Sequence, residues 1–224
     1  MSESYRNEGT DYLHSIGNTM ANLGVEIRCT VREGRPAHLI VDEAERHPGA
    51  LIAMSTHGRS GVSRWLLGSI TNKVLHATKA PLLVVRATDG KDAPTPSELT
   101  SIIVPLDGSG LAEQSLSQAT DLAKAMKLNV ILVRVETDGE EVCDKYLHEI
   151  GEKLAAEGVA SVEKRVLHGH AAVSIVDLAH DTDKSLVAMT THGRSGIGRW
   201  VLGSVTDRVV RYSGDPVLVT RASE

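Results

Sequence analysis

The sequence lacks the features that would place the chain in a membrane, in an oxidising compartment or on nucleic acid. Its two cysteines, Cys29 and Cys143, have no metal-type spacing, which favours a reduced setting. The formal net charge of −5 gives no bulk attraction for nucleic acid. No apolar run approaches the roughly 18 residues of a membrane span, and the first residues form no signal-peptide core. We therefore expect a cytoplasmic protein without membrane or nucleic-acid partners.

Signatures of catalysis and of metal binding are missing too. The chain has neither a Walker lysine (Gly-Lys-Ser/Thr) nor a Ser-Gly-Gly-x-Asp-Ser loop. His57 and His192 have no evident carboxylate or nucleophile beside them, so we interpret them as loop histidines and assign no catalytic residue. His168 and His170 flank a glycine, but the equivalent positions of the repeat described below hold Glu and Arg, so no metal site is expected. An enzyme, here a slow ATP hydrolase, is therefore the weaker alternative to a binding protein.

What the chain does contain is an internal repeat. Residues 51–86 recur as residues 186–221, at an offset of 135 without a gap and with 20 of 36 positions identical. Such a duplication predicts two copies of one fold. The expected organisation is an incomplete first repeat at 1–88, a linker at 89–100 and a complete second repeat at 101–224.

The second repeat alternates short apolar runs with amphipathic segments. Continuous apolar runs closed by turn residues predict buried strands, and apolar residues at three- and four-residue steps predict helices. Strand–helix alternation predicts parallel strands joined by helical crossovers, so the expected fold class is α/β, with two tandem doubly wound parallel sheets of Rossmann-like type. The expected strands are 101–106, 129–135, 162–167, 185–190 and 216–220, and the expected helices are 111–126, 140–157, 171–180 and 204–212.

The first repeat follows the same plan but starts late. Residues 12–17 match residues 146–151 at an offset of 134, whereas nothing in the first half matches residues 101–135. The first domain is therefore expected to lack its opening strand–helix–strand unit. Three explanations stay open: truncation of a longer protein at Met1, a gap covered by the second half or by another copy, and a reduced accessory lobe.

A glycine-containing loop and a following helix make the strongest candidate site. Gly193 follows the strand at 185–190, and Gly203 with Ser204 begins the helix at 204–212. Helix N-termini attract anions through unpaired N–H groups and the helix dipole, so a phosphate is the expected ligand. Ser204 is the expected N-cap, and Arg194 can add charge-assisted hydrogen bonds.

These motifs resemble the universal stress protein family. The resemblance rests on the Gly-x9-Gly-Ser spacing, on Met-Ser/Thr-Thr-His before it, and on the segment Val104-Pro-Leu-Asp-Gly-Ser109. It covers the whole second repeat and the first from about residue 10. The family's nucleotide-binding branch carries Gly-x2-Gly-x9-Gly-Ser/Thr. Here Thr190 stands in place of the first glycine, and Ser55 does so in the other copy.

The resemblance implies one full adenine-nucleotide site, in the second repeat. The first repeat has Gly58, Arg59, Gly68 and Ser69 but no counterpart of the adenosine side. The implied ligand is ATP, ADP or AMP, with or without Mg²⁺. The implied residues are Pro105, Asp107 and Val133 at the adenosine side, Thr190, Thr191, His192, Gly193, Arg194 and Ser195 around the ribose and phosphates, and Gly203, Ser204 and Val205 at the phosphate tail.

The resulting hypothesis is a stress-response regulatory protein that binds an adenine nucleotide. The alternative is a nucleotide-independent interaction module. The last strands, 81–85 and 216–219, open with proline and are expected at a sheet edge. Such strands suit pairing between domains, either in a homodimer or in an intramolecular pseudo-dimer.

Overall fold

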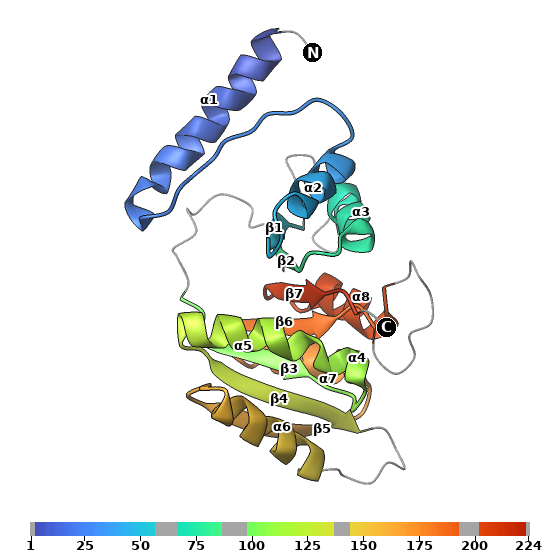
Figure 1. Cartoon of the computed structure of the whole chain (residues 1–224). Helices are drawn as coiled ribbons and strands as arrows, with labels where there is room; N and C mark the ends of the chain where they lie inside the picture. Colours follow the sequence, from blue (N-terminus) through green and yellow to red (C-terminus); the bar gives the residue numbers. More distant parts are fainter. Residues whose placement is uncertain (1–2, 57–66, 87–97, 137–143, 193–201, 223–224) are drawn as a thin grey trace.

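The computed structural model describes residues 3–56, 67–86, 98–136, 144–192 and 202–222, and these form one mixed seven-stranded sheet with helices on its faces (Figure 1). The strand order is β1-β2-β7-β6-β3-β4-β5. Every neighbouring pair is parallel except β2 with β7. The strands are β1 (Ile52–Ser55), β2 (Leu82–Val85), β3 (Ser101–Pro105), β4 (Asn129–Glu136), β5 (Val162–His168), β6 (Ser185–Thr190) and β7 (Val217–Thr220).

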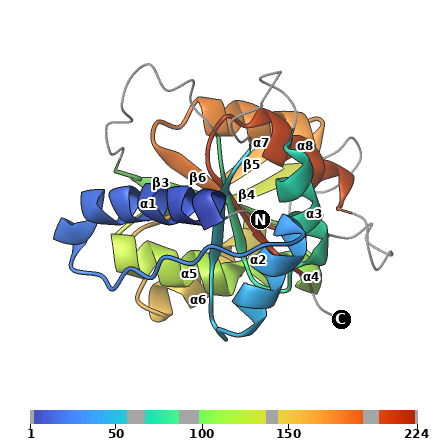
Figure 2. The ribbon, with the colours of Figure 1, turned by 90° about the horizontal axis from the view of Figure 1, so that it is seen from above.

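Helices cover the sheet from two sides. Figure 2 shows α5 and α6 on one face of the second repeat and α7 and α8 on the other. The predicted helices 171–180 and 204–212 and the predicted strand 185–190 agree with α7, α8 and β6. The helices are α1 (Glu3–Thr19), the 3-10 turn η1 (Ala21–Leu23), α2 (Pro36–Glu45), α3 (Ser69–Ala77), α4 (Gly110–Glu113), α5 (Ser115–Met126), α6 (Asp144–Ala156), α7 (Ala171–His180) and α8 (Ser204–Tyr212).

Alternate residues of the strands feed two apolar clusters, one on each face of the sheet. The cluster under α7 and α8 extends across both repeats, since it includes Leu82 and Val84 from β2 as well as Val217 and Val219 from β7. The cluster under α5 and α6 is built almost wholly from the second repeat. From β2 it gains only a partly buried side chain, Leu83. One face of the core therefore joins the two repeats.

The two expected parallel sheets are one mixed sheet, because the last strands of the two repeats pair and fuse them. In the antiparallel register of β2 and β7, Leu83 lies opposite Leu218. These residues are 135 positions apart, so they are the same position of the repeat, and a local two-fold axis passes between them. The predicted pairing of the last strands thus occurs within the chain. Each is the edge of its own repeat but an interior strand of the fused sheet, which leaves neither backbone edge unpaired.

The first repeat contributes two strands among the described residues, where the second contributes five. Residues 24–33, which align with the region of β5, are assigned neither helix nor strand. In the second repeat β5 forms its ladder with β4. The described part of the first repeat holds no counterpart of β4, so this extended segment has no strand beside it with which to pair.

Candidate functional site

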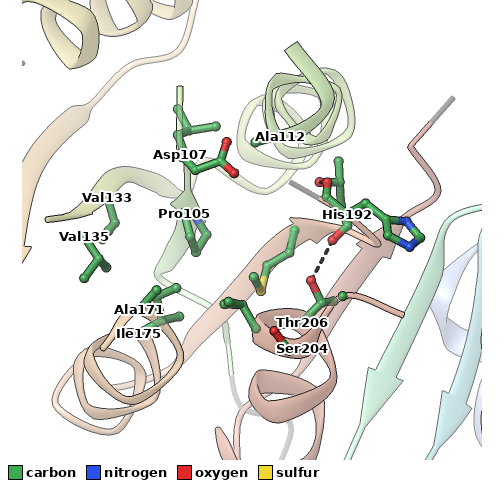
Figure 3. Close-up of a pocket in the computed structure, with 15 residues that line it drawn as sticks. Pro105, Asp107, Ala112, Val133, Val135, Ala171, Ile175, His192, Ser204 and Thr206 are labelled. Atoms are coloured by element: carbon green, nitrogen blue, oxygen red, sulfur yellow. Dashed lines mark hydrogen bonds between the residues drawn. The ribbon is translucent and has the colours of Figure 1, made fainter. Parts of the chain in front are cut away.

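A cavity of about 120 Å³ opens at the carboxyl ends of β3, β4 and β6, beside the first turn of α8 (Figure 3). β3 lies between β4 and β6, so the chain leaves this point toward both sides of the sheet. Such a switch point is where doubly wound sheets bind ligands. The lining residues are Pro105, Leu106, Asp107, Ala112, Val133, Val135, Ala171, Ile175, Met189, Thr190, His192, Gly203, Ser204, Val205 and Thr206.

Asp107 brings a half-buried carboxylate to the mouth of this cavity. Its Oδ1 accepts hydrogen bonds from the Ser109 amide at 2.9 Å and from the Ser109 hydroxyl at 2.6 Å. The Ser109 hydroxyl in turn caps α4 by accepting from the Ala112 amide at 3.2 Å. The turn after β3 therefore holds Asp107 in place, so the residue has a structural role as well as a place at the cavity.

A partly buried phenol lies near Asp107. Tyr146 of α6 donates a hydrogen bond to Glu113 Oε1 at 3.0 Å, and the Arg134 guanidinium lies 5.8 Å from its ring centroid. Burial raises the pKa of Tyr146 above its usual value, and the carboxylates of Glu113 and Asp107 raise it further. Tyr146 therefore stays protonated at neutral pH and acts as a hydrogen-bond donor.

Gly203, not Ser204, is the N-cap of α8. Gly203 has φ −57° and ψ 143°, and Ser204 is the first helical residue, with its side chain exposed. The expected capping role of Ser204 is thus wrong. Asp207, in the first turn of α8, accepts two hydrogen bonds from Arg211 Nε at 2.9 Å. The first N–H groups of a helix have no partner inside the helix, so this end of α8 presents donors beside the cavity.

The glycine at the start of α8 is required by close contact. The Gly203 amide donates to the Thr191 carbonyl at 2.8 Å, and an added Cβ would lie 2.9 Å from that oxygen. Thr206 ties the same turn to β6, because its hydroxyl donates to the Thr190 carbonyl at 2.8 Å (Figure 3). The conformation of Gly203 is open to other residues, so packing explains this glycine without invoking a ligand.

Thr190, which replaces the first motif glycine, turns its hydroxyl onto its own loop. Thr190 Oγ1 donates to the His192 carbonyl at 2.7 Å, and the residue is 5% exposed. His192 Nδ1 lies 3.1 Å from the Thr191 hydroxyl. Its Nε2 is buried without a hydrogen-bond partner among the described residues. In Figure 3 the His192 ring points away from Asp107 and Val133, so its Nε2 does not face the cavity.

The cavity unites most of the residues expected at the site. Thr191 does not line it. Its hydroxyl accepts a hydrogen bond from the Ala222 amide at 3.2 Å. Gly193, Arg194 and Ser195, with the rest of the 193–201 loop, lie outside the described residues, as do His57, Gly58 and Arg59 of the first copy. The lining residues expected from sequence are Pro105, Asp107, Val133, Thr190, His192, Gly203, Ser204 and Val205.

Sequence reasoning missed the apolar floor of the cavity and one threonine. Apolar residues such as Val135, Ile175 and Met189 fit a buried core equally well, so their types gave no signal. Thr206 had a signal in the sequence, because the first repeat has a threonine, Thr71, at the same position. The Thr71 hydroxyl donates to the Ser55 carbonyl at 3.0 Å, as the Thr206 hydroxyl does to the Thr190 carbonyl. The other missed residues are Leu106, Ala112 and Ala171.

The first repeat builds the same strand-to-helix junction. Gly68 is the N-cap of α3 with φ −55° and ψ 144°, and its amide donates to the Thr56 carbonyl at 2.6 Å. An added Cβ on Gly68 would lie 2.7 Å from that oxygen. No described residue of the first repeat supplies counterparts of the walls at Pro105, Asp107 and Val133.

Within the described residues, no group of three or more His, Cys, Asp or Glu side chains is arranged to hold a metal ion. No helix described for this chain has both the length and the apolar character needed to cross a membrane.

Comparison with known proteins gives one consistent family. The model of the Universal stress protein family matches residues 8–86 and again residues 136–221. A universal stress protein of Mycolicibacterium smegmatis is 26% identical over 212 residues, which are 88% of this chain and 70% of that protein. A second relative, from Methanocaldococcus jannaschii, is 37% identical over 86 residues, 38% of this chain and 51% of that protein.

Solved structures show the same fold. A universal stress protein from Archaeoglobus fulgidus covers all of this chain, and 84% of its own length is matched, with a TM-score of 0.77 at 23% identity. A universal stress protein solved in complex with cAMP covers 57% of this chain, and all of its own length is matched, at 23% identity. Its TM-score of 0.48 is too low to transfer that ligand.

Proposed function

Because the chain belongs to the universal stress protein family, we propose that it is a stress-response regulatory protein that binds ATP or a related adenine nucleotide in its second repeat. One observation carries the proposal: the Asp107 carboxylate and the first turn of α8 border the same cavity. A carboxylate accepts hydrogen bonds from ribose hydroxyls or an amino group, whereas a helix N-terminus attracts phosphate. Adenine nucleotides have both kinds of group.

The walls suggest how such a ligand would lie. Val133, Val135 and Ile175 offer an apolar surface for the base, and the amides of Ser204 and Val205 would face the phosphates. At about 120 Å³ the cavity is smaller than the roughly 300–1,000 Å³ typical of small-molecule pockets. It would therefore enclose only part of the ligand, at its nucleoside end, with the phosphates outside it at the first turn of α8. Gly193, Arg194 and Ser195, which the family resemblance assigns to the phosphates, would add further contacts.

We assign the site to binding and regulation without a catalytic group. Asp107 is already bonded by its own turn, and His192 contacts Thr191. Neither forms a base–nucleophile pair in the described residues. Mg²⁺, if it accompanies the nucleotide, would be held mainly by phosphate oxygens and water. The alternative, a nucleotide-independent interaction module, was expected to dimerise through the last strand of each repeat. These strands, β2 and β7, are interior strands of the sheet and are not available to a second copy.

The test is a charge placed at the start of α8. Ser204→Asp favours the helix dipole but opposes a phosphate, so nucleotide binding should weaken by at least about tenfold while α8 stays folded. Titration calorimetry with ATP, ADP and AMP measures this effect. Ser69→Asp, at the same position of the first repeat, is the matched control and should leave the affinity unchanged.

A second variant tests the other end of the ligand. Asp107→Asn keeps an acceptor oxygen for the Ser109 turn but removes the charge, and should weaken adenosine and AMP to a similar extent. If the unmodified protein binds no adenine nucleotide at millimolar concentrations, the nucleotide-independent alternative holds. If Ser69→Asp weakened nucleotide binding relative to the unmodified protein, the site would instead lie in the first repeat.

A further inference from the structure

The two copies of the repeated segment are basic, although the chain as a whole is acidic. Residues 51–86 and 186–221 together hold ten Lys and Arg residues against two Asp and no Glu. The rest of the chain holds the other fourteen Lys and Arg residues against twenty-seven Asp and Glu. An excess of one charge sign that is confined to one part of a chain indicates a surface for partners of the opposite sign.

The fold brings the basic parts of both copies onto one side of the sheet. Val74 of α3 and Val209 of α8 belong to the same apolar cluster, so these two helices cover the same side. Figures 1 and 2 both show α3 close to α8. We call this surface the basic face and define it by its described cations, which are Lys73, Lys79, Arg86, Arg208, Arg211 and Arg221.

Half of these cations lie in solvent without a counter-charge. Lys73, Lys79 and Arg208 are exposed, and none of them forms an ion pair with another described residue. Arg208 is the counterpart of Lys73 and is exposed in the repeat that has all five strands. The exposure of Lys73 therefore does not come from the strands that the first repeat lacks.

Two arginines continue the basic face across the junction between the repeats. Arg221 Nη1 donates to the carbonyl of Thr78, the C-cap of α3, at 3.4 Å. In the other direction, an added Cβ on Gly214, just after α8, would lie 3.3 Å from Arg86 Nη1. Arg86 and Arg221 are the same position of the repeat, so each reaches the helix end of the opposite repeat. Cations are favourable at helix C-termini, which explains why these charges are held there.

Few acidic residues lie among these cations. Residues 67–86 contain no Asp or Glu, and residues 202–222 contain only Asp207 and Asp215. Asp207 pairs with Arg211 at 2.9 Å, and Asp215 is half-buried in the turn after α8. The basic face therefore keeps most of its positive charge.

Acidic residues border the basic face. α2 and α7 pack against α3 and α8, and Asp42 of α2 lines a groove together with Lys73. Asp177 is the same position on α7 and is exposed. An extended polyanion such as duplex DNA would run past these residues onto the acidic remainder of the chain, which opposes its binding. A short acidic ligand can stay within the basic face.

We propose that the basic face is a docking surface for a short acidic segment of another protein. Carboxylates of such a segment would pair with the exposed cations of α3 and α8 and with the two arginines at the junction. Complementary charge steers the encounter of the partners and disfavours partners of the wrong sign. Because the face lies across the junction, it exists only where the two repeats share one sheet.

Docking of this kind goes beyond the proposed function and does not depend on it. The cavity beside Asp107 contains none of the six cations of the basic face. The two proposals fail separately, because docking is measured with a peptide in the absence of nucleotide, whereas the proposed function is measured by nucleotide titration.

The experiment uses a fluorescent oligo-glutamate peptide as the probe and measures its anisotropy with the full chain. The affinity should fall by about tenfold or more between about 0.1 M and about 1 M salt, because the Debye length shortens from about 10 Å to about 3 Å. At low salt the double variant Lys73→Glu with Arg208→Glu should bind the peptide about tenfold or more weakly.

The matched control reverses two exposed lysines on the other side of the sheet. Lys127 follows α5 and Lys153 lies in the last turn of α6. Lys127→Glu with Lys153→Glu changes the net charge by the same amount, but should change the affinity by less than about threefold, because these charges lie far from the peptide and are screened. Thermal unfolding of both double variants checks that each is folded.

Three outcomes would overturn the proposal. One is a full chain that gives no change in peptide anisotropy at low salt. Another is an equal loss of affinity in both double variants, which would reflect net charge alone. The third is tighter binding of duplex DNA or of phosphatidylserine vesicles than of the peptide, since the face would then serve a different class of partner. If the first double variant unfolds, Lys73→Gln with Arg208→Gln replaces it, and a loss of at least about threefold is then required.

Discussion

Gly203 and Gly68 occupy equivalent positions where a strand end and a helix start nearly touch. An added Cβ would lie 2.9 Å from the Thr191 carbonyl oxygen in one case and 2.7 Å from the Thr56 carbonyl oxygen in the other. Both neighbours are backbone atoms, which cannot turn aside as a side chain does. We expect Gly203→Ala to lower the free energy of unfolding by about 1–3 kcal/mol through overpacking. Urea denaturation measures this change.

Gly110→Ala is the control for that measurement. Gly110 lies at the start of α4, and an added Cβ there meets no atom within 4 Å. Its substitution should change the free energy of unfolding by less than about 0.5 kcal/mol. Equal effects at Gly110 and Gly203 would show that the contact with Thr191 is not what demands a glycine.

Asp215, in the turn between α8 and β7, gives the fold a pH dependence. Burial raises its pKa from 3.8 to about 6, although His180 lowers it in part. The folded state therefore holds this proton more tightly than the unfolded state does. The stabilising contribution is complete below pH 3.8 and is lost as the pH rises to about 6.

Asp215→Asn should remove this loss. Relative to the unmodified protein, we expect the variant to gain stability progressively between pH 4 and about pH 6, and to keep that gain above it. Urea denaturation across this range measures the difference. Asp181→Asn, an exposed residue at the end of α7, should show no such trend. A gain for Asp215→Asn that does not vary with pH would contradict the assignment.

At the scale of elements, β2 and β7 hold the two repeats in one sheet. Leu218 is 1% exposed within the cluster under α5, whereas its two-fold counterpart Leu83 is only partly buried. We expect Leu218→Ala to cost about 2–4 kcal/mol of unfolding free energy, and Leu83→Ala clearly less. Denaturant unfolding of both variants tests this. A larger loss of unfolding free energy for Leu83→Ala would mean that Leu83 is more deeply buried in solution than Leu218.

Local sequence patterns were sufficient for elements whose partners lie in the same repeat. The helix at 171–180 and the strand at 185–190 were predicted with their observed bounds, since each has an apolar pattern and clear turn residues. Residues 24–33 show why patterns can fail. By their position in the repeat they align with the region of β5, but a strand needs a neighbour, and no described strand lies beside them. Fusion of the sheets likewise depends on which edges meet, which periodicity does not encode.

The candidate site was predictable where a residue type implies a conformation or a charge. Asp107 and Gly203 stood out because a carboxylate at a strand end and a glycine before a helix are informative. Ile175 and Met189 were not distinguishable from core residues. The expected cap at Ser204 was wrong by one residue, because the close contact with Thr191 places glycine at the cap itself.

For the molecule as a whole, the two repeats should differ in their resistance to proteolysis. Arg28 and Arg32 lie in an extended segment with no ladder to a described strand, whereas Lys164 and Arg165 lie in β5, which is paired along its length with β4. Cleavage requires local opening of the backbone. We expect trypsin to cut at Arg28 and Arg32 well before Lys164 and Arg165, as followed by mass spectrometry. Comparable cleavage rates at the two pairs of sites would show that residues 24–33 are protected as well as β5 is.

The axis between Leu83 and Leu218 has a further consequence. Two separate single-repeat chains that met through their last strands would dissociate on dilution, because their association depends on concentration. Here the same two strands belong to one polypeptide, so their encounter is intramolecular and their effective concentration is fixed by the connecting chain. The junction between the halves should therefore persist at any dilution, and its melting temperature should not vary with the amount of protein in the sample.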